Sequence, residues 1–420
     1  MRHIIIIGNG ISGITAARNI RKKSSDNITV ISSETEHFFS RTALMYIYMG
    51  HMKYEHTKPY EDWFWKKNRI ELVFNHVESV DAQSKKLLLK HGKTLTYDIL
   101  IIATGSKSNK FGWPGQDLKG VMGMYGKPDV DLLETYSANA KHAVIVGGGL
   151  IGIELAEMLL SRNIGVTFLV REKSFWNNVL PAEESALIND IIKLHHIDLQ
   201  LKTELKEITP DETGHVKSIT TSNGDIIPCQ IVGLTAGVTP NIGFLKNSTI
   251  ETDRGVLVNE FLETNILDVY AIGDCAQHRV PPAGRRPVEQ VWYTGRIMGE
   301  TVANTICGQK QAYQPGHWFN SAKFFDLEYQ TYGWVYPELK PEEDTWYWEN
   351  KQNNQALRFV YMKNTRILTG VNAFGIRLRH EVFDQWLTGK KTLDFVLDNL
   401  KDALFDPEFT PKPEFSNSKI

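Results

Sequence analysis

Two glycine-rich turns of the same pattern occur in this chain, GNGISG at residues 8–13 and GGGLIG at residues 147–152. Each turn follows a short apolar run, residues 3–7 in the first case and residues 143–146 in the second. In such a unit the first glycine makes a tight turn, the second lets the backbone approach a pyrophosphate, and the third lets the helix pack on the strand. The helix dipole then faces the phosphates with its positive end. The two turns therefore predict two dinucleotide sites, with electron transfer between two nucleotide cofactors.

A chain of 420 residues is too long for one hydrophobic core, which predicts two or three domains. The formal net charge of -2 and the pI near 6.7 give no basic footprint for nucleic acid. The first strand begins almost at Met1 and no apolar stretch is long enough to span a bilayer, so we expect a cytoplasmic protein. Cys229, Cys275 and Cys307 lie far apart in the sequence, which indicates reduced thiols and no metal site.

Strands and helices alternate after each turn. In the first unit a helix from about Ile11 leads to a strand at residues 28–31, and Glu34 follows about twenty residues after Gly13, where a carboxylate can bind both hydroxyls of an adenosine ribose. Short alternating segments at residues 71–74, 77–81, 85–89 and 95–100 predict an antiparallel meander. It ends in an apolar strand that stops at small residues, as a buried parallel strand does beside a cofactor: Ala103, Thr104 and Gly105.

The second unit has nearly the same layout. It predicts strands at residues 166–170 and 232–237, followed later by an apolar strand that begins at residue 269. That last strand delivers Asp274 directly after Gly273. At the carboxyl end of a buried strand this carboxylate is expected to accept hydrogen bonds from a polyol, and a solvated loop acid is the alternative.

These motifs resemble a known family. GNGISG, the ATG at residues 103–105, GGGLIGIELAE from residue 147 and AIGDCA at residues 271–276 have the order and spacing of the two-dinucleotide-domain flavoproteins, the pyridine nucleotide-disulfide oxidoreductase family. The resemblance implies an α/β fold with two Rossmann-like dinucleotide-binding domains and a C-terminal α+β domain. It places FAD on the first turn and NAD(P)H on the second. The implied boundaries are 1–112 and 238–309 for the FAD domain, 113–237 for the NAD(P)H domain and 310–420 for the last domain.

The resemblance also assigns residues to FAD. It implies contacts to the pyrophosphate from the first turn and Arg41, to the adenosine ribose from Glu34, to the adenine from the Val77 backbone, and to the ribitol from Asp274. A helix beginning near residues 288–293 would face the pyrimidine side of the flavin and stabilise negative charge on the reduced ring. The full set of FAD candidates is Gly8, Gly10, Ser12, Gly13, Glu34, Arg41, Thr42, Val77, Ala103, Thr104, Gly105, Gly273, Asp274, Glu289, Gln290 and Val291. Gly237, at the end of the predicted NAD(P)H domain, is a further cofactor candidate.

For the second cofactor the resemblance implies a nicotinamide dinucleotide cradled by Gly147, Gly149, Leu150, Ile151 and Gly152, with Glu154 near the flavin and nicotinamide rings. The position at which an acid would select NADH holds Val170, and Arg171 follows. A cation there can pair with a ribose 2'-phosphate, which favours NADPH. The neighbouring Glu172 partly offsets this charge, so NADH remains the alternative.

The branch of the family is indicated by missing cysteines. Relatives that use a thiol keep it in or beside the segment that here reads SRTALMY, residues 40–46. The chain instead resembles NAD(P)H:ferredoxin and rubredoxin reductases and the flavoprotein domain of nitrite reductases. In that branch an aromatic strand lies near the flavin, which makes Trp318 a further cofactor candidate. The chain departs from the branch at Tyr46, where a lysine usually pairs with the glutamate at Glu154.

We therefore expect an FAD-dependent NAD(P)H oxidoreductase that passes electrons to a small redox protein such as ferredoxin or rubredoxin. No side chain need act as an acid or a base in the hydride step, because the cofactors carry the chemistry. A flavin oxidase or a quinone or small-molecule reductase is one alternative, and a redox-sensing regulatory flavoprotein is another. We expect a monomer or a homodimer.

Overall fold

The computed structural model describes residues 1–408, and its contacts divide the chain into two compact units. The first unit comprises Met1–Asn109, Gly123–Thr135 and Gly237–Pro315, and the second comprises Lys110–Met122, Tyr136–Ala236 and the chain from residue 316. The interruption of the first unit by the second agrees with the expected layout. The grouping of residues 123–135 with the first unit does not follow the predicted boundaries, which stay a prediction.

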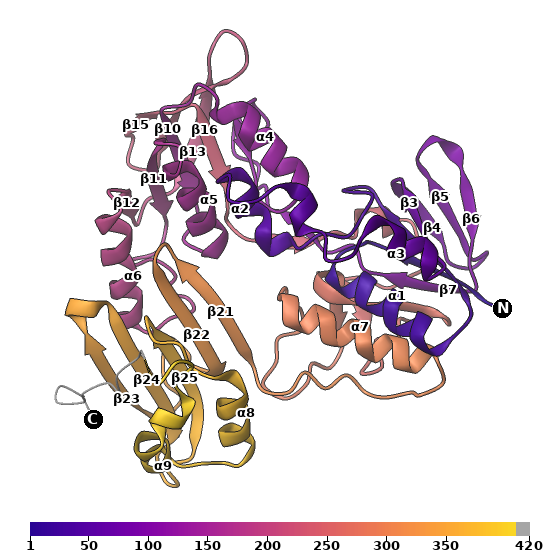
Figure 1. Cartoon of the computed structure of the whole chain (residues 1–420). Coiled ribbons are helices and arrows are strands. Elements are labelled where there is room, and N and C mark those ends of the chain that lie inside the picture. Colours follow the sequence, from indigo (N-terminus) through magenta and orange to yellow (C-terminus); the bar gives the residue numbers. More distant parts are fainter. Residues whose placement is uncertain (409–420) are drawn as a thin grey trace. The chain divides into compact units, whose positions relative to one another are not determined.

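The first unit is built on a five-stranded parallel sheet with the strand order β19-β7-β1-β2-β3. The strands are β1 (His3–Ile7), β2 (Asn27–Ser32), β3 (Ile70–Phe74), β7 (Ile99–Ile102) and β19 (Val269–Ala271). The central strands β1 and β7 are almost entirely isoleucine and leucine because both of their faces are covered. Helices α1 (Ile11–Lys23) and α7 (Trp292–Ile306) lie side by side against this sheet (Figure 1).

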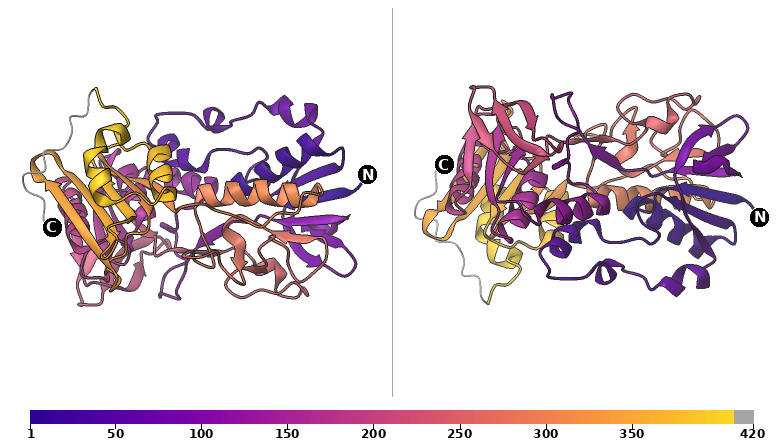
Figure 2. Two further views of the ribbon diagram at one scale, coloured as in Figure 1. Left: turned by 90° about the horizontal axis from the view of Figure 1, so that it is seen from below. Right: turned by 90° about the horizontal axis from the view of Figure 1, so that it is seen from above.

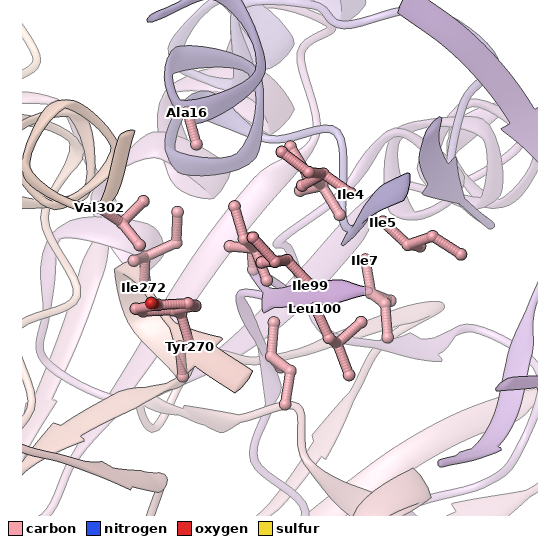
Figure 3. Close-up of a cluster of buried hydrophobic side chains, with 14 of the residues drawn as sticks. Ile4, Ile5, Ile7, Ala16, Ile99, Leu100, Tyr270, Ile272 and Val302 are labelled. Carbon is pink, nitrogen blue, oxygen red and sulfur yellow. The ribbon is translucent and has the colours of Figure 1, made fainter. Parts of the chain in front are cut away.

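The core of the first unit lies between this sheet and its helices. Figure 3 shows part of it, with side chains labelled from β1, α1, β7, the segment around β19, and α7: Ile4, Ile5, Ile7, Ala16, Ile99, Leu100, Tyr270, Ile272 and Val302. Helices α1 and α7 can pack closely because residue 299 is a glycine. A Cβ added there would lie only 2.6 Å from the backbone oxygen of Ser12. This packing fixes the start of α7 beside the start of α1.

The antiparallel meander is smaller than predicted. It consists of β4 (Val77–Asp81), β5 (Lys86–Leu89) and β6 (Thr94–Thr96). The segment at residues 71–74 is instead part of β3, which pairs in parallel with β2. The predicted strand at residues 95–100 is divided between β6 and β7, because the chain leaves the meander there and enters the parallel sheet. Alternation of apolar residues alone does not distinguish these two kinds of partner.

The second unit contains another five-stranded parallel sheet, with the order β12-β11-β10-β16-β9. Its strands are β9 (Val121–Met122), β10 (His142–Val146), β11 (Gly165–Val170), β12 (Asp198–Leu201) and β16 (Ile231–Leu234). Helix α5 (Leu150–Leu160) follows β10, and α6 (Ala182–Leu194) lies between β11 and β12 in sequence. A three-stranded antiparallel sheet adds β13 (Leu205–Pro210), β14 (Val216–Thr221) and β15 (Ile226–Pro228). Both parallel sheets therefore have the topology that the glycine turns predict.

The C-terminal part of the second unit is an antiparallel sheet with the order β21-β22-β25-β24-β23. The strands are β21 (Phe319–Phe324), β22 (Leu327–Gly333), β23 (Glu343–Asn350), β24 (Gln355–Met362) and β25 (Leu368–Phe374). Helices α8 (His380–Thr388) and α9 (Leu393–Asp398) cover it (Figure 2). Its core is aromatic, as predicted, with Tyr332, Trp346, Phe359, Phe383 and Trp386 buried together. The α+β architecture expected for this region is confirmed within the described residues.

A buried ion pair holds α6 to this C-terminal sheet. The Arg358 guanidinium on β24 donates through Nε to Glu184 Oε1 at 2.8 Å, and Asn372 donates to Glu184 Oε2 at 2.7 Å. Burial raises the pKa of Glu184, which is fully covered. Because a buried carboxylate without partners is very costly, removing either partner would strongly destabilise this contact.

The remaining elements are short. The first unit also contains α2 (Leu44–Tyr48), α3 (Asp62–Lys67), and the pairs β8 (Ser106–Ser108) with β17 (Val238–Pro240) and β18 (Val256–Val258) with β20 (Ala276–His278). Helix α4 (Lys127–Ser137) begins in the first unit. Within residues 1–408, none of the helices combines the length and apolar character needed to cross a membrane.

Candidate cofactor sites

The first glycine turn joins β1 to α1, and two of its glycines are required by packing. Gly8 has a φ of +114°, and a Cβ added there would lie 2.1 Å from the Ala103 carbonyl oxygen. A Cβ at Gly13 would lie 2.1 Å from the Gly8 carbonyl oxygen. The first and third glycines therefore let the turn, the end of β7 and the helix come together.

Gly10 differs from its two neighbours because a Cβ added there would meet nothing within 4 Å. It is the N-cap residue of α1, and no side chain caps the helix there. There is thus open space at Gly10, beside the positive end of the helix dipole. The second glycine of the motif leaves the room that a pyrophosphate needs, so the residues present fit a bound dinucleotide.

The second turn, between β10 and α5, repeats this geometry. Gly147 has a φ of +123°, with a Cβ position 2.8 Å from the Thr235 carbonyl oxygen, and Gly152 packs against Gly147 and Phe168. Gly149 is the uncapped N-cap of α5, and a Cβ there would again meet nothing within 4 Å. The partly buried side chains of Leu150 and Ile151 begin the helix. Both predicted turns therefore have the geometry of dinucleotide sites.

The predicted adenosine end of the first site contains a carboxylate and a guanidinium in direct contact. Arg41 donates to Glu34 through two nitrogens, at 3.0 and 2.6 Å, and the Lys127 amide donates to Glu34 Oε1 at 2.9 Å. A Cβ added at Gly126 would lie 2.7 Å from that same oxygen. The structure thus brings the two predicted residues together and adds the start of α4, which sequence reasoning missed.

Tyr125 is a second residue that sequence reasoning missed. Its carbonyl oxygen accepts a hydrogen bond from Arg41 Nη1 at 2.7 Å, and the Arg41 guanidinium lies 4.7 Å from the centre of its ring. Its hydroxyl donates to Asp274 Oδ2 at 3.1 Å and accepts from the Ser106 amide at 2.9 Å. Tyr125 therefore links the residues of the predicted adenosine end to that of the predicted ribitol end. No short motif around it signals this role.

Asp274 lies on the 3-10 turn Gly273–Cys275 that follows β19, at the carboxyl edge of the sheet. Burial raises the pKa of this carboxyl, while Tyr125 and Arg41 oppose the rise. Ser12 packs beside it, since Cβ atoms added at Gly273 and Gly295 would lie 2.3 and 2.5 Å from the Ser12 hydroxyl. The start of α1, the start of α7 and Asp274 therefore converge on one place.

The other cofactor candidates of the first unit lie on several of its elements. Ala103 and Thr104 follow β7, and the Thr104 hydroxyl donates to the Asn241 carbonyl at 2.8 Å. Gly105 and Gly237 both have positive φ values. Val77 is buried at the start of β4, and Thr42 is exposed beside Arg41.

The segment before α7 includes a buried ion pair. Arg285 donates to both carboxylate oxygens of Glu289, at 2.6 and 2.8 Å, and both side chains are almost fully covered. The Glu289 side chain thus binds Arg285, so a contact to a cofactor would have to come from its backbone. Gln290 donates to the Ser106 hydroxyl at 2.7 Å, and Val291 is the uncapped N-cap of α7. The predicted helix start is confirmed, and its open amino end fits an anionic group.

Three predicted residues belong to the second unit. The residue Glu154 on α5 is exposed, but its carboxyl group is partly withdrawn from water. This desolvation, together with repulsion by Glu157, raises the pKa of Glu154 to about 7. Arg171 follows β11 and is exposed, and its Nε donates to Glu172 Oε1 at 2.7 Å. Trp318 stacks on Trp334, with ring centres 4.9 Å apart. The roles of these residues toward a cofactor stay predictions.

All three thiols lie away from the segment at residues 40–46. Cys229 and Cys275 are fully buried, and Cys307 is partly buried. Burial raises the pKa of each thiol, in Cys229 to about 12. Thiols with raised pKa values are poor nucleophiles because only the thiolate reacts.

Two parallel sheets, each with a glycine turn open at its second position, define a flavoprotein fold with two dinucleotide-binding domains. The model of the family described as pyridine nucleotide-disulphide oxidoreductase matches residues 2–299, and the chain belongs to that family. It is 31% identical to the 5,5'-dehydrodivanillate O-demethylase ferredoxin reductase subunit of Sphingobium sp., over 78% of this chain and 81% of that one. It is 29% identical to the NAD(P)H nitrite reductase of Bacillus subtilis, over 66% of this chain but only 35% of that enzyme.

Among solved structures, a ferredoxin reductase from Rhodopseudomonas palustris has the same fold, with a TM-score of 0.81 at 22% identity. The match covers 89% of this chain and 91% of that chain. The chain is thus an FAD-dependent NAD(P)H oxidoreductase with FAD and NAD(P)H as its cofactors, as predicted.

Proposed function

We propose that this chain passes electrons from NAD(P)H to a small redox protein of the ferredoxin or rubredoxin type. The observation that carries the proposal is the combination of two open glycine turns with the absence of a thiol from residues 40–46. Without a sulfur relay, electrons must leave the flavin directly. The ferredoxin reductase subunit that covers most of this chain supports the same class of acceptor.

The side chains of the first unit would bind and orient FAD. The open space at Gly10 and the free amides of α1 suit the pyrophosphate, and Glu34 suits the adenosine ribose. Because Glu34 already accepts from Arg41, the guanidinium would hold the carboxylate in place and remain beside the phosphates. Asp274, oriented by Tyr125, would accept hydrogen bonds from the ribitol hydroxyls.

A bound flavin supplies the chemistry that protein side chains lack, acceptance of a hydride and release of electrons to an acceptor. The uncapped start of α7 would stabilise negative charge at the nearby ring. The buried pair of Arg285 and Glu289 would keep this helix start in place. No described side chain is needed as a general acid or base.

The second unit would bind NADPH in preference to NADH. Val170 is buried at the end of β11, so no carboxylate stands at the position that repels a 2'-phosphate. The contact of Arg171 with Glu172 uses the Nε atom, which leaves the terminal guanidinium nitrogens for a phosphate. The reduced state expected of the three thiols supports a cytoplasmic location.

Steady-state assays with NADPH and four acceptors test the proposal: ferredoxin, rubredoxin and a water-soluble quinone under anaerobic conditions, and oxygen in air-saturated buffer. We expect reduction of at least one of the two proteins to exceed reduction of quinone and oxygen by tenfold or more in kcat/KM. A preference for oxygen or quinone would instead identify an oxidase or a small-molecule reductase. Failure of all four acceptors, in protein that binds FAD and is reduced by NADPH, would favour a regulatory flavoprotein.

A further inference from the structure

A surface cavity of about 530 Å³ lies at the amino ends of β1, β2 and β3 in the first unit. The strands are parallel, and the glycine turn follows the carboxyl end of β1, so this cavity is at the opposite edge of the sheet from the dinucleotide site. Its volume is within the range of about 300 to 1,000 Å³ that is typical of small-molecule sites. The cavity is therefore large enough for a ligand and separate from the FAD site.

A chain of hydrogen bonds crosses one side of the cavity. The Thr29 hydroxyl donates to Glu71 Oε2 at 2.8 Å, and His3 Nε2 lies 2.9 Å from the same hydroxyl oxygen. Because Thr29 has one proton to donate, His3 Nε2 must carry the proton of the second bond. The other Glu71 oxygen has no hydrogen bond within residues 1–408, so it can accept one from a ligand hydroxyl.

The rim of the cavity is cationic. Lys66 and Arg69 line it and form no ion pair with any residue that the structure describes. Arg69 has a φ of +52°, which turns the chain from α3 into β3, and its carbonyl accepts from Arg21 Nη2 at 2.9 Å. Burial and then the nearby charge of Arg69 lower the pKa of Arg21. The two cations, Lys66 and Arg69, outnumber the one carboxylate of the lining, Glu71, so the net charge of the lining favours an anion.

The second unit repeats the hydrogen-bond chain. His142 Nε2 lies 3.0 Å from the Thr167 hydroxyl, which donates to Asp198 Oδ2 at 3.2 Å. In the second unit, however, the Phe325 ring covers the end of α6. It stacks on His195, the residue that follows this helix, with ring centres 4.2 Å apart. The hydrogen-bond chain is thus a part of both sheets. The open cavity with more cations than carboxylates in its lining is the feature that distinguishes the first unit and points to a ligand.

We propose that this cavity binds a small phosphorylated polyol, such as a sugar phosphate, independently of the proposed electron transfer. The phosphate would bind Lys66 and Arg69, because a guanidinium and an ammonium together suit its charge and geometry. The hydroxyls would bind Glu71 and Asn27, both of which line the cavity.

Isothermal titration calorimetry of the FAD-loaded protein tests this proposal, with ribose 5-phosphate, ribose and inorganic phosphate as probes. Saturating NADP⁺ is present to block the second dinucleotide site. We expect ribose 5-phosphate to bind at one site per chain, and at least about tenfold more tightly than either fragment. The double variant K66A/R69A should weaken this binding by about tenfold or more.

The variant K22A/K67A is the matched control, because it removes two neighbouring exposed cations that do not line the cavity. It should leave the Kd for ribose 5-phosphate within about twofold. Equal weakening in both variants would reveal non-specific attraction and overturn the proposal. So would undetectable binding at about 10 mM ligand. Inorganic phosphate that binds as tightly as the sugar phosphate would also overturn it, since the polyol contacts would then contribute nothing.

Discussion

The Tyr125 hydroxyl donates a hydrogen bond to the Asp274 carboxylate at 3.1 Å, although 149 positions separate the two residues in sequence. The same tyrosine holds Arg41 through its carbonyl oxygen and its ring. A single residue therefore contacts both ends of the predicted FAD site, and loss of its hydroxyl should weaken binding of the cofactor.

We expect Tyr125→Phe to weaken FAD binding by about tenfold, because Asp274 loses a hydrogen bond worth about 1 to 2 kcal/mol. Fluorescence titration of the apoprotein with FAD measures the change. Tyr97→Phe is the control, since the buried Tyr97 hydroxyl has no hydrogen-bond partner among the described residues. An unchanged Kd in Tyr125→Phe would remove Tyr125 from the cofactor site.

Substitutions at two glycines of the first turn should have different effects, at Gly8 on the free energy of unfolding and at Gly10 on FAD binding. Gly8→Ala introduces a Cβ 2.1 Å from a carbonyl oxygen at a φ of +114°, so we expect a loss of at least about 2 kcal/mol in unfolding free energy. Gly10→Val should leave the stability of the apoprotein nearly intact but weaken FAD binding at least about tenfold. Denaturant unfolding and FAD titration measure the two effects. Gly243→Val, at another open position, is the control and should alter neither.

Arg171→Ala should raise the KM for NADPH by about tenfold, equivalent to about 1.4 kcal/mol, and leave the KM for NADH nearly unchanged. The reason is the loss of the cation that would pair with the 2'-phosphate. Lys173→Ala removes a nearby exposed charge and serves as the control. A wild-type protein with a strong preference for NADH would contradict this assignment.

His278 should make stability depend on pH. Both of its ring nitrogens are buried without hydrogen-bond partners among the described residues, and its ring stacks on Tyr313 at 5.1 Å. Burial, and then the charge of Arg285, lowers its pKa from 6.5 to about 4. Between these pH values the unfolded chain binds more protons than the folded protein. The contribution of neutral His278 to the free energy of unfolding is therefore fully present above pH 6.5 and is lost as the pH decreases toward 4.

The expected loss from His278 is up to about 1.4 kcal/mol for each pH unit in that window. His278→Phe retains a ring against Tyr313 and should flatten the corresponding part of the curve of unfolding free energy against pH. The half-buried His215 provides a control, His215→Phe, which should leave the curve unchanged. A His278→Phe curve that parallels the wild type would contradict the prediction.

Turnover should not require a thiol. A variant carrying Cys229→Ala, Cys275→Ala and Cys307→Ser should reduce ferricyanide at a rate within about twofold of the wild type, because the thiols have raised pKa values and little thiolate. Anaerobic titration with NADPH should consume two electrons per FAD. Consumption of four electrons, or inactivity of a variant that still binds FAD, would indicate a disulfide or peroxide reductase.

Much of the fold could be predicted because its signals are local. The turn at Gly8 and the turn at Gly147 each lie between one strand and one helix, so a few adjacent residues specify them. The strand β4 was predicted with its observed bounds, and the small residues after β7 correctly marked its end. The prediction that residues 71–74 belong to the antiparallel meander was wrong, because the apolar pattern of β3 does not reveal whether its neighbour runs parallel or antiparallel.

The two dinucleotide turns and the absence of a thiol from residues 40–46 could be identified before the fold was known, and with them the class of flavoprotein, since each depends on residue types at fixed short spacing. Contacts between groups that are distant in sequence became known from the folded arrangement. Residues 123–135 return to the first unit and place Tyr125 and the Lys127 amide beside Glu34 and Asp274. The cationic cavity at Lys66 and Arg69 likewise depends on three strands aligned side by side. Long-range pairing of this kind is fixed by packing of the whole unit, and no local pattern records it.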